Sequence, residues 1–215
     1  MPSLRFEREA GEGVAGIDEA GRGPLAGPVV AAAVVFAGNA VPRGLARAID
    51  DSKKLTPEVR SEIAAKLWAL RAAGRAWIGV GAASAEVIDQ INILQATFLA
   101  MRRAVDRLGT APRFALVDGN RLPQLPCAAR AVVDGDALCL SIAAASIVAK
   151  VARDHAMQRL ARRYPPYGWE SNAGYPTAYH LAALAAHGPS PHHRVTFGPL
   201  RQGQLGLDAP VDDSN

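Results

Sequence analysis

An uninterrupted apolar run from Val29 to Phe36 places the strongest constraint on how this chain folds. The run has the length of a strand, and it is much shorter than the roughly 20 residues that cross a membrane as a helix. A short predicted strand, Val14 to Asp18, ends in an acid and precedes the run across a glycine- and proline-rich turn from Gly21 to Pro28. So compact a connection predicts an antiparallel pair of strands, the second of them buried.

Strand-like and helical patterns alternate through the rest of the chain. Further strands are predicted over residues 76–82, 114–117 and 129–133, and helices that begin near residues 57, 92, 137 and 177 and end near residues 74, 109, 163 and 188. Thr56, Asn92 and Thr177 are of types that cap the first turn of a helix. The small side chains of Ser141 to Ile147 let the long helix approach a sheet closely. This order predicts a mixed α/β protein with helices packed on the sheet.

Composition limits the class of protein. The 215 residues are 49% hydrophobic and 20% charged, which is typical of one folded domain and not of a disordered chain. The start of the chain lacks the apolar core of a signal peptide, so we expect a cytoplasmic protein without a membrane segment. Cys127 and Cys139 lack metal-binding spacing, which favours two buried free thiols. A net charge of +4 and a pI of about 9.4 fit a polyanionic partner.

Acidic residues follow three of the predicted strands: Asp18 with Glu19, then Asp118, then Asp136. Each alone is more typical of a turn or a helix cap. Together they predict a cluster, because a sheet can gather the ends of its strands at one edge. Clustered carboxylates repel each other unless cations lie among them, and ligand sets of oxygen alone suit Mg²⁺ or Mn²⁺. Two such ions, about 3.5–4 Å apart, can support cleavage of a phosphodiester.

The segment from Gly16 to Pro28 strongly resembles the first motif of bacterial ribonuclease HII. The resemblance continues in order over roughly residues 14 to 201, through residues 51–55, 91–94, 117–120, 135–136, 141–151, 153–154, 174–177 and 197–199. It implies a ribonuclease H-like fold, with a five-stranded mixed sheet flanked by helices and a small helical C-terminal extension. We therefore expect a catalytic domain over residues 1–200, with its helical C-terminal part at about 165–200, and a flexible tail over residues 201–215.

The same resemblance implies an endonuclease that hydrolyses the RNA strand of RNA–DNA hybrids and cuts on the 5′ side of single ribonucleotides embedded in duplex DNA. Its products would carry 3′-hydroxyl and 5′-phosphate ends, and its role would be ribonucleotide removal in DNA replication and repair. By motif match, Asp18, Glu19, Asp118 and Asp136 would be the catalytic acids and the ligands of two Mn²⁺ or Mg²⁺ ions. We expect a monomer.

Substrate recognition is expected from a glycine-rich loop and an aromatic residue. Glycines allow close backbone approach, so Gly21-Arg22-Gly23 can direct amides at the 2′-hydroxyl that distinguishes RNA from DNA, and the resemblance implies that role. It also implies that Tyr175 packs on the deoxyribose after the ribonucleotide. The alternatives are an ordinary strand connection and a tyrosine packed on the sheet. Lys53, Lys54 and Arg194 are predicted to contact phosphates.

Two departures from the family pattern lie near the predicted site. Asp134 stands where the family commonly has lysine, and an extra carboxylate there would weaken the attraction for phosphate or perturb metal binding. Asn172-Ala173 stand where the family often has histidine and lysine, which would remove a phosphate contact. Neither departure changes the four acids.

Three other patterns are weaker. Gly11 to Gly16 matches the glycine pattern of dinucleotide-binding proteins but precedes a strand instead of following one. The histidines between residues 180 and 193 lack cysteine or acidic partners at ligand spacing, which favours surface or packing roles over a zinc site. Gln202 to Leu207 resemble a peptide that binds a sliding clamp, which makes the clamp a candidate partner, although short patterns of this kind often arise by chance.

Two other functions remain open on the sequence. One is a DNA nuclease of the ribonuclease H-like superfold, such as a resolvase or transposase, because one fold hosts many functions. Activity on all-DNA duplexes would favour it, whereas the Gly21-Arg22-Gly23 loop with Tyr175 favours an RNA sensor. The other is a basic nucleic-acid-binding module with structural acids, which predicts no metal dependence and an Asp118→Asn variant that functions normally.

Overall fold

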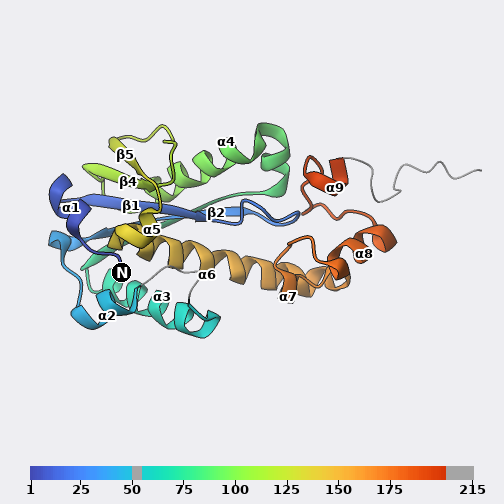
Figure 1. Cartoon of the computed structure of the whole chain (residues 1–215), viewed down its shortest axis with the longest axis horizontal. Coiled ribbons are helices and arrows are strands. Elements are labelled where there is room, and N and C mark those ends of the chain that lie inside the picture. Colours follow the sequence, from blue (N-terminus) through green and yellow to red (C-terminus); the bar gives the residue numbers. More distant parts are fainter. Residues whose placement is uncertain (50–54, 202–215) are drawn as a thin grey trace, which may run out of the picture.

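The computed structural model describes residues 1–49 and 55–201, which fold around one mixed sheet (Figure 1). The strands are β1 (Val14–Ala20), β2 (Val29–Phe36), β3 (Ala76–Ala83), β4 (Phe114–Asp118) and β5 (Ala128–Val132), in the spatial order β3-β2-β1-β4-β5. β2 pairs antiparallel with β1 and β3, whereas β4 runs parallel to β1 and β5. The predicted five-stranded mixed sheet and the antiparallel pair are confirmed.

Both faces of the sheet are covered, which explains the apolar run of β2. All of its residues are buried, and alternate side chains of a strand point to opposite faces. Its even-numbered residues from Ala32 to Phe36 pack toward α3 (Pro57–Ala72) and α6 (Leu140–Arg163), and its odd-numbered residues from Val29 to Val35 pack toward α4 (Ala85–Asp106). Figure 1 shows α4 on one side of the sheet and α3 and α6 on the other.

The long helix α6 lies very close to the sheet. Ser141 to Ala145 are buried, as their small side chains predicted, and a Cβ on Gly16 of β1 would overlap the backbone of Ser141. Gly81 of β3 allows α4 the same close approach on the opposite face, where a Cβ would overlap the Ala100 carbonyl. Glycine is therefore required at these strand positions because helix backbone occupies the space of a side chain.

Three helix starts follow the predicted caps. The side chains of Thr56, Asn92 and Thr177 each accept hydrogen bonds from backbone amides of the following turn. Asn92 nevertheless lies within α4, at a φ of 64°, because a helical half that begins at Ala85 precedes it. The Ser84 hydroxyl caps that first half, a start that was not predicted.

The predicted start of the long helix near residue 137 is wrong. Cys139 is extended and separates a short helix, α5 (Gly135–Leu138), from α6. The cause lies far away in the sequence: Ser3 forms an isolated β-bridge with Cys139, donating to the Leu138 carbonyl and accepting from the Leu140 amide. A local pattern of small residues carries no information about such a partner.

Short helices complete the structure. Those that were not predicted are α1 (Arg5–Ala10), η1 (Ala37–Asn39) and α2 (Arg43–Ala48), and the C-terminal part contains η2 (Pro165–Tyr167), α7 (Trp169–Asn172), α8 (Ala178–His187) and α9 (Gly198–Arg201). The C-terminal part has its own apolar cluster around Trp169 and Leu184, which also includes Leu25 and Met157. None of the described helices is long and apolar enough to cross a bilayer. Both cysteines are free thiols, but only Cys139 is buried, whereas Cys127 is half-buried.

Candidate active site

The four predicted acids come from neighbouring strand ends at one edge of the sheet. Asp18 and Glu19 lie near the end of β1, and Asp118 is the last residue of the parallel strand β4. Asp136 lies in the first turn of α5, just after β5. The Gly135 amide donates to Asp118 Oδ1 at 2.8 Å, which ties the start of α5 to the end of β4. Asp18, Glu19 and Asp118 line one hollow of about 300 Å³, and Asp136 is buried.

Negative charge accumulates at this edge. Burial is the main cause that raises the pKa of Asp18 well above its usual value, followed by the charges of Glu19 and Asp118, while a hydrogen bond from Ser146 opposes the rise. Burial also raises the pKa of Glu19, with the charge of Arg22 opposing and that of Asp118 adding to it. The carboxylates therefore destabilise one another for as long as no cation neutralises them.

The donor chemistry fits a hard divalent cation, because carboxylates supply only oxygen atoms and their repulsion would be relieved by positive charge. As the side chains lie, no three histidine, cysteine or acidic residues within 1–49 and 55–201 are close enough to enclose an ion. Glu19 is instead paired with Arg22 at 3.1 Å, and Asp118 accepts from Gly135. An ion at Glu19 would therefore compete with Arg22, whose side chain is half exposed.

The Gly21-Arg22-Gly23 loop follows β1 and lines the same hollow as the acids and Tyr175. Gly21 has a φ of 93°, which favours glycine, and a Cβ there would overlap the side chain of Arg153. A Cβ on Gly23 would lie 3.8 Å from the Tyr175 ring. Tyr175 is 49% exposed, which argues against a tyrosine packed on the sheet. The structure thus brings loop, tyrosine and three acids together.

Arg194 was predicted to contact phosphate, and the structure contradicts that prediction. Its side chain is fully buried, and its guanidinium donates four hydrogen bonds of 2.6–3.1 Å to three carbonyl oxygens, those of Gly21, Arg22 and Gly27. Burial, together with the nearby charge of Arg153, lowers the pKa of Arg194 to about 9, so the group still carries its charge at neutral pH. Arg194 therefore holds the glycine loop from behind.

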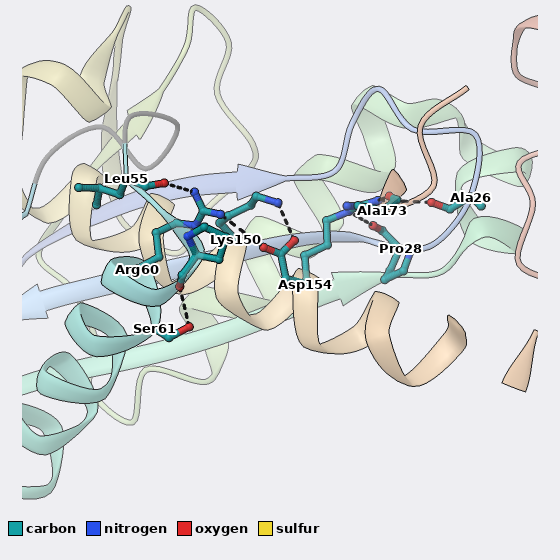
Figure 2. A network of polar contacts seen from close by, with 10 residues as sticks. Ala26, Pro28, Leu55, Arg60, Ser61, Lys150, Asp154 and Ala173 are labelled. Carbon is teal, nitrogen blue, oxygen red and sulfur yellow. Dashed lines mark hydrogen bonds and ion pairs between the residues drawn. The ribbon is translucent and has the colours of Figure 1, made fainter. Parts of the chain in front are cut away.

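Arg153 is a second buried guanidinium, and it was not predicted as a site residue. It donates to the carbonyls of Ala26, Pro28 and Ala173 at 3.4, 3.2 and 3.0 Å, and Figure 2 shows these three carbonyls converging from two segments of the chain. Within the described part of the chain, neither buried arginine has a carboxylate partner. Arg153 thus connects the segment between the glycine loop and β2 to the loop that carries Tyr175.

Asn172 and Ala173, the second departure from the family pattern, shape that tyrosine loop. The buried Asn172 side chain donates to the Tyr167 carbonyl at 2.7 Å and accepts from the Gly174 amide at 2.8 Å. Ala173 adopts a left-handed conformation, at a φ of 48°, and presents its carbonyl to Arg153. These positions therefore have structural roles, whatever phosphate contact they lack.

Buried histidines support the same loop. His180 Nδ1 lies 2.9 Å from the Tyr175 carbonyl oxygen, and its Nε2 lies 3.0 Å from His193 Nε2. Trp169 donates to His180 Nε2 at 3.1 Å, and the Ser190 amide donates to His193 Nδ1. Burial lowers the pKa of His180, and it lowers that of His193 to about 4. These histidines pack as neutral rings, in agreement with the prediction of a packing role.

Asp134, the first departure, also has a backbone role. It is exposed and lies in the left-handed region at a φ of 53°, directly before α5, where its carbonyl accepts from Ala137. Aspartate tolerates this conformation better than most residues because its short polar side chain can bond locally. The extra carboxylate is therefore at the surface.

A chain of ion pairs borders the hollow on the α6 side. Lys150 lines the hollow and donates to Asp154 at 2.5 Å, and Arg60 of α3 lies 3.9 Å from Asp154 (Figure 2). Arg60 also donates to the Leu55 carbonyl at 2.7 Å. Lys150 is a basic site residue that was not predicted.

A second hollow of about 310 Å³ adjoins the first. It shares Glu19, Arg22 and Asp118 with the first hollow and extends toward Phe98 and Arg121. The acids therefore lie between two connected depressions, which is the arrangement that an extended polymer passing over them would require.

A protein-family model described as Ribonuclease HII matches residues 15–198. The chain belongs to the ribonuclease HII family. The ribonuclease HII of Granulibacter bethesdensis is 64% identical over 202 residues, which cover 94% of this chain and 91% of that protein. As a ribonuclease H, this protein is an endoribonuclease that acts on RNA–DNA hybrids. The family decides against the alternatives of a resolvase-type DNA nuclease and a non-catalytic module.

Solved structures of ribonuclease HII relatives agree in fold. The ribonuclease H2 from Pyrococcus horikoshii OT3 has a TM-score of 0.69 at 26% identity, covering 91% of this chain and 99% of that one. The ribonuclease HII in the PCNA:RNase HII complex from Archaeoglobus fulgidus also has a TM-score of 0.69 at 26% identity, covering 86% and 95%. The predicted ribonuclease H-like fold is thereby confirmed.

Proposed function

We propose that this ribonuclease HII cuts on the 5′ side of single ribonucleotides embedded in duplex DNA, besides hydrolysing the RNA strand of hybrids. The products would carry 3′-hydroxyl and 5′-phosphate ends, and the reaction would serve ribonucleotide removal in DNA replication and repair. The observation that supports this most strongly is that a carboxylate cluster, the glycine loop and Tyr175 line one hollow.

Asp18, Glu19, Asp118 and Asp136 are the proposed catalytic acids and the proposed ligands of two Mn²⁺ or Mg²⁺ ions. Two ions in such a set would supply an activated water and positive charge at the departing oxygen. The protein's own contribution is to hold these oxygens at the ends of rigid strands. Ser146, which donates to Asp18, orients that carboxylate.

Gly21, Arg22 and Gly23 are the proposed readers of the ribose 2′-hydroxyl. Arg194 donates to the carbonyls of Gly21 and Arg22, and all three loop residues line the hollow. A 2′-hydroxyl is both a donor and an acceptor, so backbone groups suffice to detect it. Half-exposed Tyr175, across from Gly23, is the proposed platform for the following deoxyribose.

Phosphate contacts are proposed from basic residues around the two hollows. Lys53 and Lys54 lie outside the described residues, so their predicted contacts stay a prediction. Lys150, which lines the first hollow, and Arg121, which is exposed in the second, take the role that was predicted for Arg194. Lysine and arginine at such rims position a nucleic acid without reading its sequence.

A sliding clamp is a second proposed partner. The segment from Gln202 to Leu207, which lies outside the described residues, resembles a clamp-binding peptide, and the ribonuclease HII of Archaeoglobus fulgidus was solved in a complex with PCNA. A pull-down with the clamp should retain the full chain and lose a chain that ends at Leu200. Equal binding of the two chains would rule this segment out.

The deciding experiment uses a DNA duplex that contains one ribonucleotide, incubated with the protein and Mg²⁺, Mn²⁺ or a chelator. Cleavage on the 5′ side of the ribonucleotide, with either ion and not with chelator, is expected, together with its loss in Asp118→Asn. Folded wild-type protein that leaves this duplex intact while degrading a continuous hybrid would overturn the single-ribonucleotide activity. An all-DNA duplex serves as the matched control and should stay intact.

A further inference from the structure

A buried carboxylate of the N-terminal helix contacts the start of α6 behind the active site. Glu7 of α1 is 1% exposed, and its Oε1 accepts from the Ser141 amide at 2.8 Å and from the Ser141 hydroxyl at 2.7 Å. The match to the family model begins only at residue 15, so α1 lies outside it. The proposed catalytic roles leave this contact unexplained.

Glu7 acts as the cap that α6 does not supply itself. The first amides of a helix have no partner within the helix, and a negative group is favourable there because of the helix dipole. Cys139, at the N-cap position of α6, makes no side-chain capping bond. A carboxylate from a helix 134 positions earlier in the chain takes its place.

Ser141 lies where connections to the acids meet. On one side, β1 packs on its backbone at Gly16, two positions before Asp18. On the other side, the Cys139 amide donates to the Gly135 carbonyl at 2.7 Å, and the Gly135 amide donates to Asp118. A displacement of the α5–α6 junction would therefore move the supports of the acids together.

The same N-terminal segment holds this junction a second time. The Ser3 amide donates to Leu138 at 3.1 Å, and the Ser3 carbonyl accepts from Leu140 at 3.0 Å, on either side of the break at Cys139. Ser3 and Glu7 thus form hydrogen bonds with residues 138–141, which directly follow Asp136 in the chain. The break between α5 and α6 exists where this segment pairs with it.

Stability alone does not explain the carboxylate. Glu7 Oε2 is buried and has no hydrogen-bond partner among the described residues. A buried acceptor without a partner lowers stability, and a neutral cap such as serine would avoid that loss. The length of the Glu7 side chain is what lets it reach Ser141 from α1.

We propose that Glu7 is a positioning residue of the active site. By holding Ser141, the N-terminal segment fixes the α5–α6 junction and, through it, the spacing of Asp118 and Asp136, which sets the affinity for the divalent cation. This inference rests on the proposed metal role of those acids. Glu7 itself contacts neither the acids nor the hollow.

The test measures Mn²⁺ binding directly, from the electron paramagnetic resonance signal of free Mn²⁺, with full-length chains at a temperature where circular dichroism shows each variant folded. Glu7→Ala is expected to weaken Mn²⁺ binding about tenfold, as loss of an outer support of a metal site does. Glu7→Gln keeps an acceptor for Ser141 and is expected to bind within about threefold of wild type. Glu9→Ala, on the exposed face of the same helix and paired with Arg5, is the matched control and should bind normally.

The outcomes separate this inference from the function on which it rests. A Glu7→Ala chain that melts at a lower temperature but binds Mn²⁺ like wild type would show a merely structural cap and overturn the proposal. So would a Glu7→Gln chain that binds as weakly as Glu7→Ala, because the hydrogen bonds to Ser141 would then not be the cause. If wild type itself shows no Mn²⁺ binding that Asp118→Asn removes, the metal role of the acids fails first and the inference fails with it.

Discussion

Replacing Arg194 with lysine tests whether a planar guanidinium holds the glycine loop. The substitution keeps the charge but concentrates the donors at one point, so the ammonium cannot reach all three carbonyls that Arg194 bonds. We assume that two carbonyls lose their partner. A buried acceptor without a partner costs about 1–3 kcal/mol, so the free energy of unfolding should fall by about 2–6 kcal/mol.

For a chain of this size, about 1 kcal/mol corresponds to roughly 2–4 °C in Tm, so Arg194→Lys should melt about 4–24 °C below wild type. Cleavage should suffer as well, because a loop displaced by about 1 Å can lower the rate by about 100-fold. The assays are thermal unfolding in chelator, and kcat/KM on a duplex with one ribonucleotide at a temperature where both chains are folded.

The matched control is Arg159→Lys, on the exposed surface of α6, which should change stability by less than about 0.5 kcal/mol and leave cleavage unaffected. An Arg194→Lys chain that melts within about 1 °C of wild type and cleaves at the same rate would refute the reasoning, since the fork geometry would then contribute nothing.

Three further predictions concern the same site. Gly21→Ala should lose about 2–5 kcal/mol of stability and most ribonucleotide cleavage in the same assays, because its φ disfavours a side chain and Arg153 occupies the space. Asp18→Asn should abolish cleavage yet raise the Tm in chelator, by about 2–4 °C for each 1 kcal/mol of repulsion relieved, since burial and neighbouring charges raise the pKa of Asp18; an unchanged or lower Tm would contradict this. Burial lowers the pKa of His193 to about 4, so the unfolded chain binds the extra proton below a pH of about 6.5. The stability of wild type relative to His193→Asn should be full above that pH and fall by up to about 3 kcal/mol as the pH drops toward 4, measured by urea unfolding, whereas a constant difference would exclude the effect.

The acids could be predicted because their signal is local. Each follows an apolar strand, and parallel strands bring their ends to the same edge, so Asp18 and Asp118 had to meet once β1 and β4 paired. The caps at Thr56 and Thr177 are local as well, and they were found for the same reason. The helix that carries Asp136 was not predicted correctly, because the break between α5 and α6 has no signal in the local sequence.

Residues that act through distant partners could not be predicted. Arg194 follows two histidines in a short basic cluster, and nothing in that pattern shows whether it faces solvent or three carbonyls more than 160 positions away. Glu7 belongs to a start of the chain that is rich in charged residues, and nothing in that pattern indicates that it is buried against Ser141. The partners of Arg194 are backbone carbonyls, which leave no trace in the identity of the partner residue, and the partner of Glu7 is a single serine 134 positions away.

The first motif therefore encodes its own support as well as its chemistry. A side chain on Gly16 would overlap Ser141, and one on Gly21 would overlap Arg153. Both glycines are therefore required by neighbouring groups of the protein itself. Because Arg153 and Arg194 are bonded to carbonyls and to no carboxylate among the described residues, they fix the loop without adding negative charge beside an edge that is already acidic. Discrimination of RNA from DNA at this site should then depend as strongly on Arg153 and Arg194 as on the loop that is proposed to read the 2′-hydroxyl.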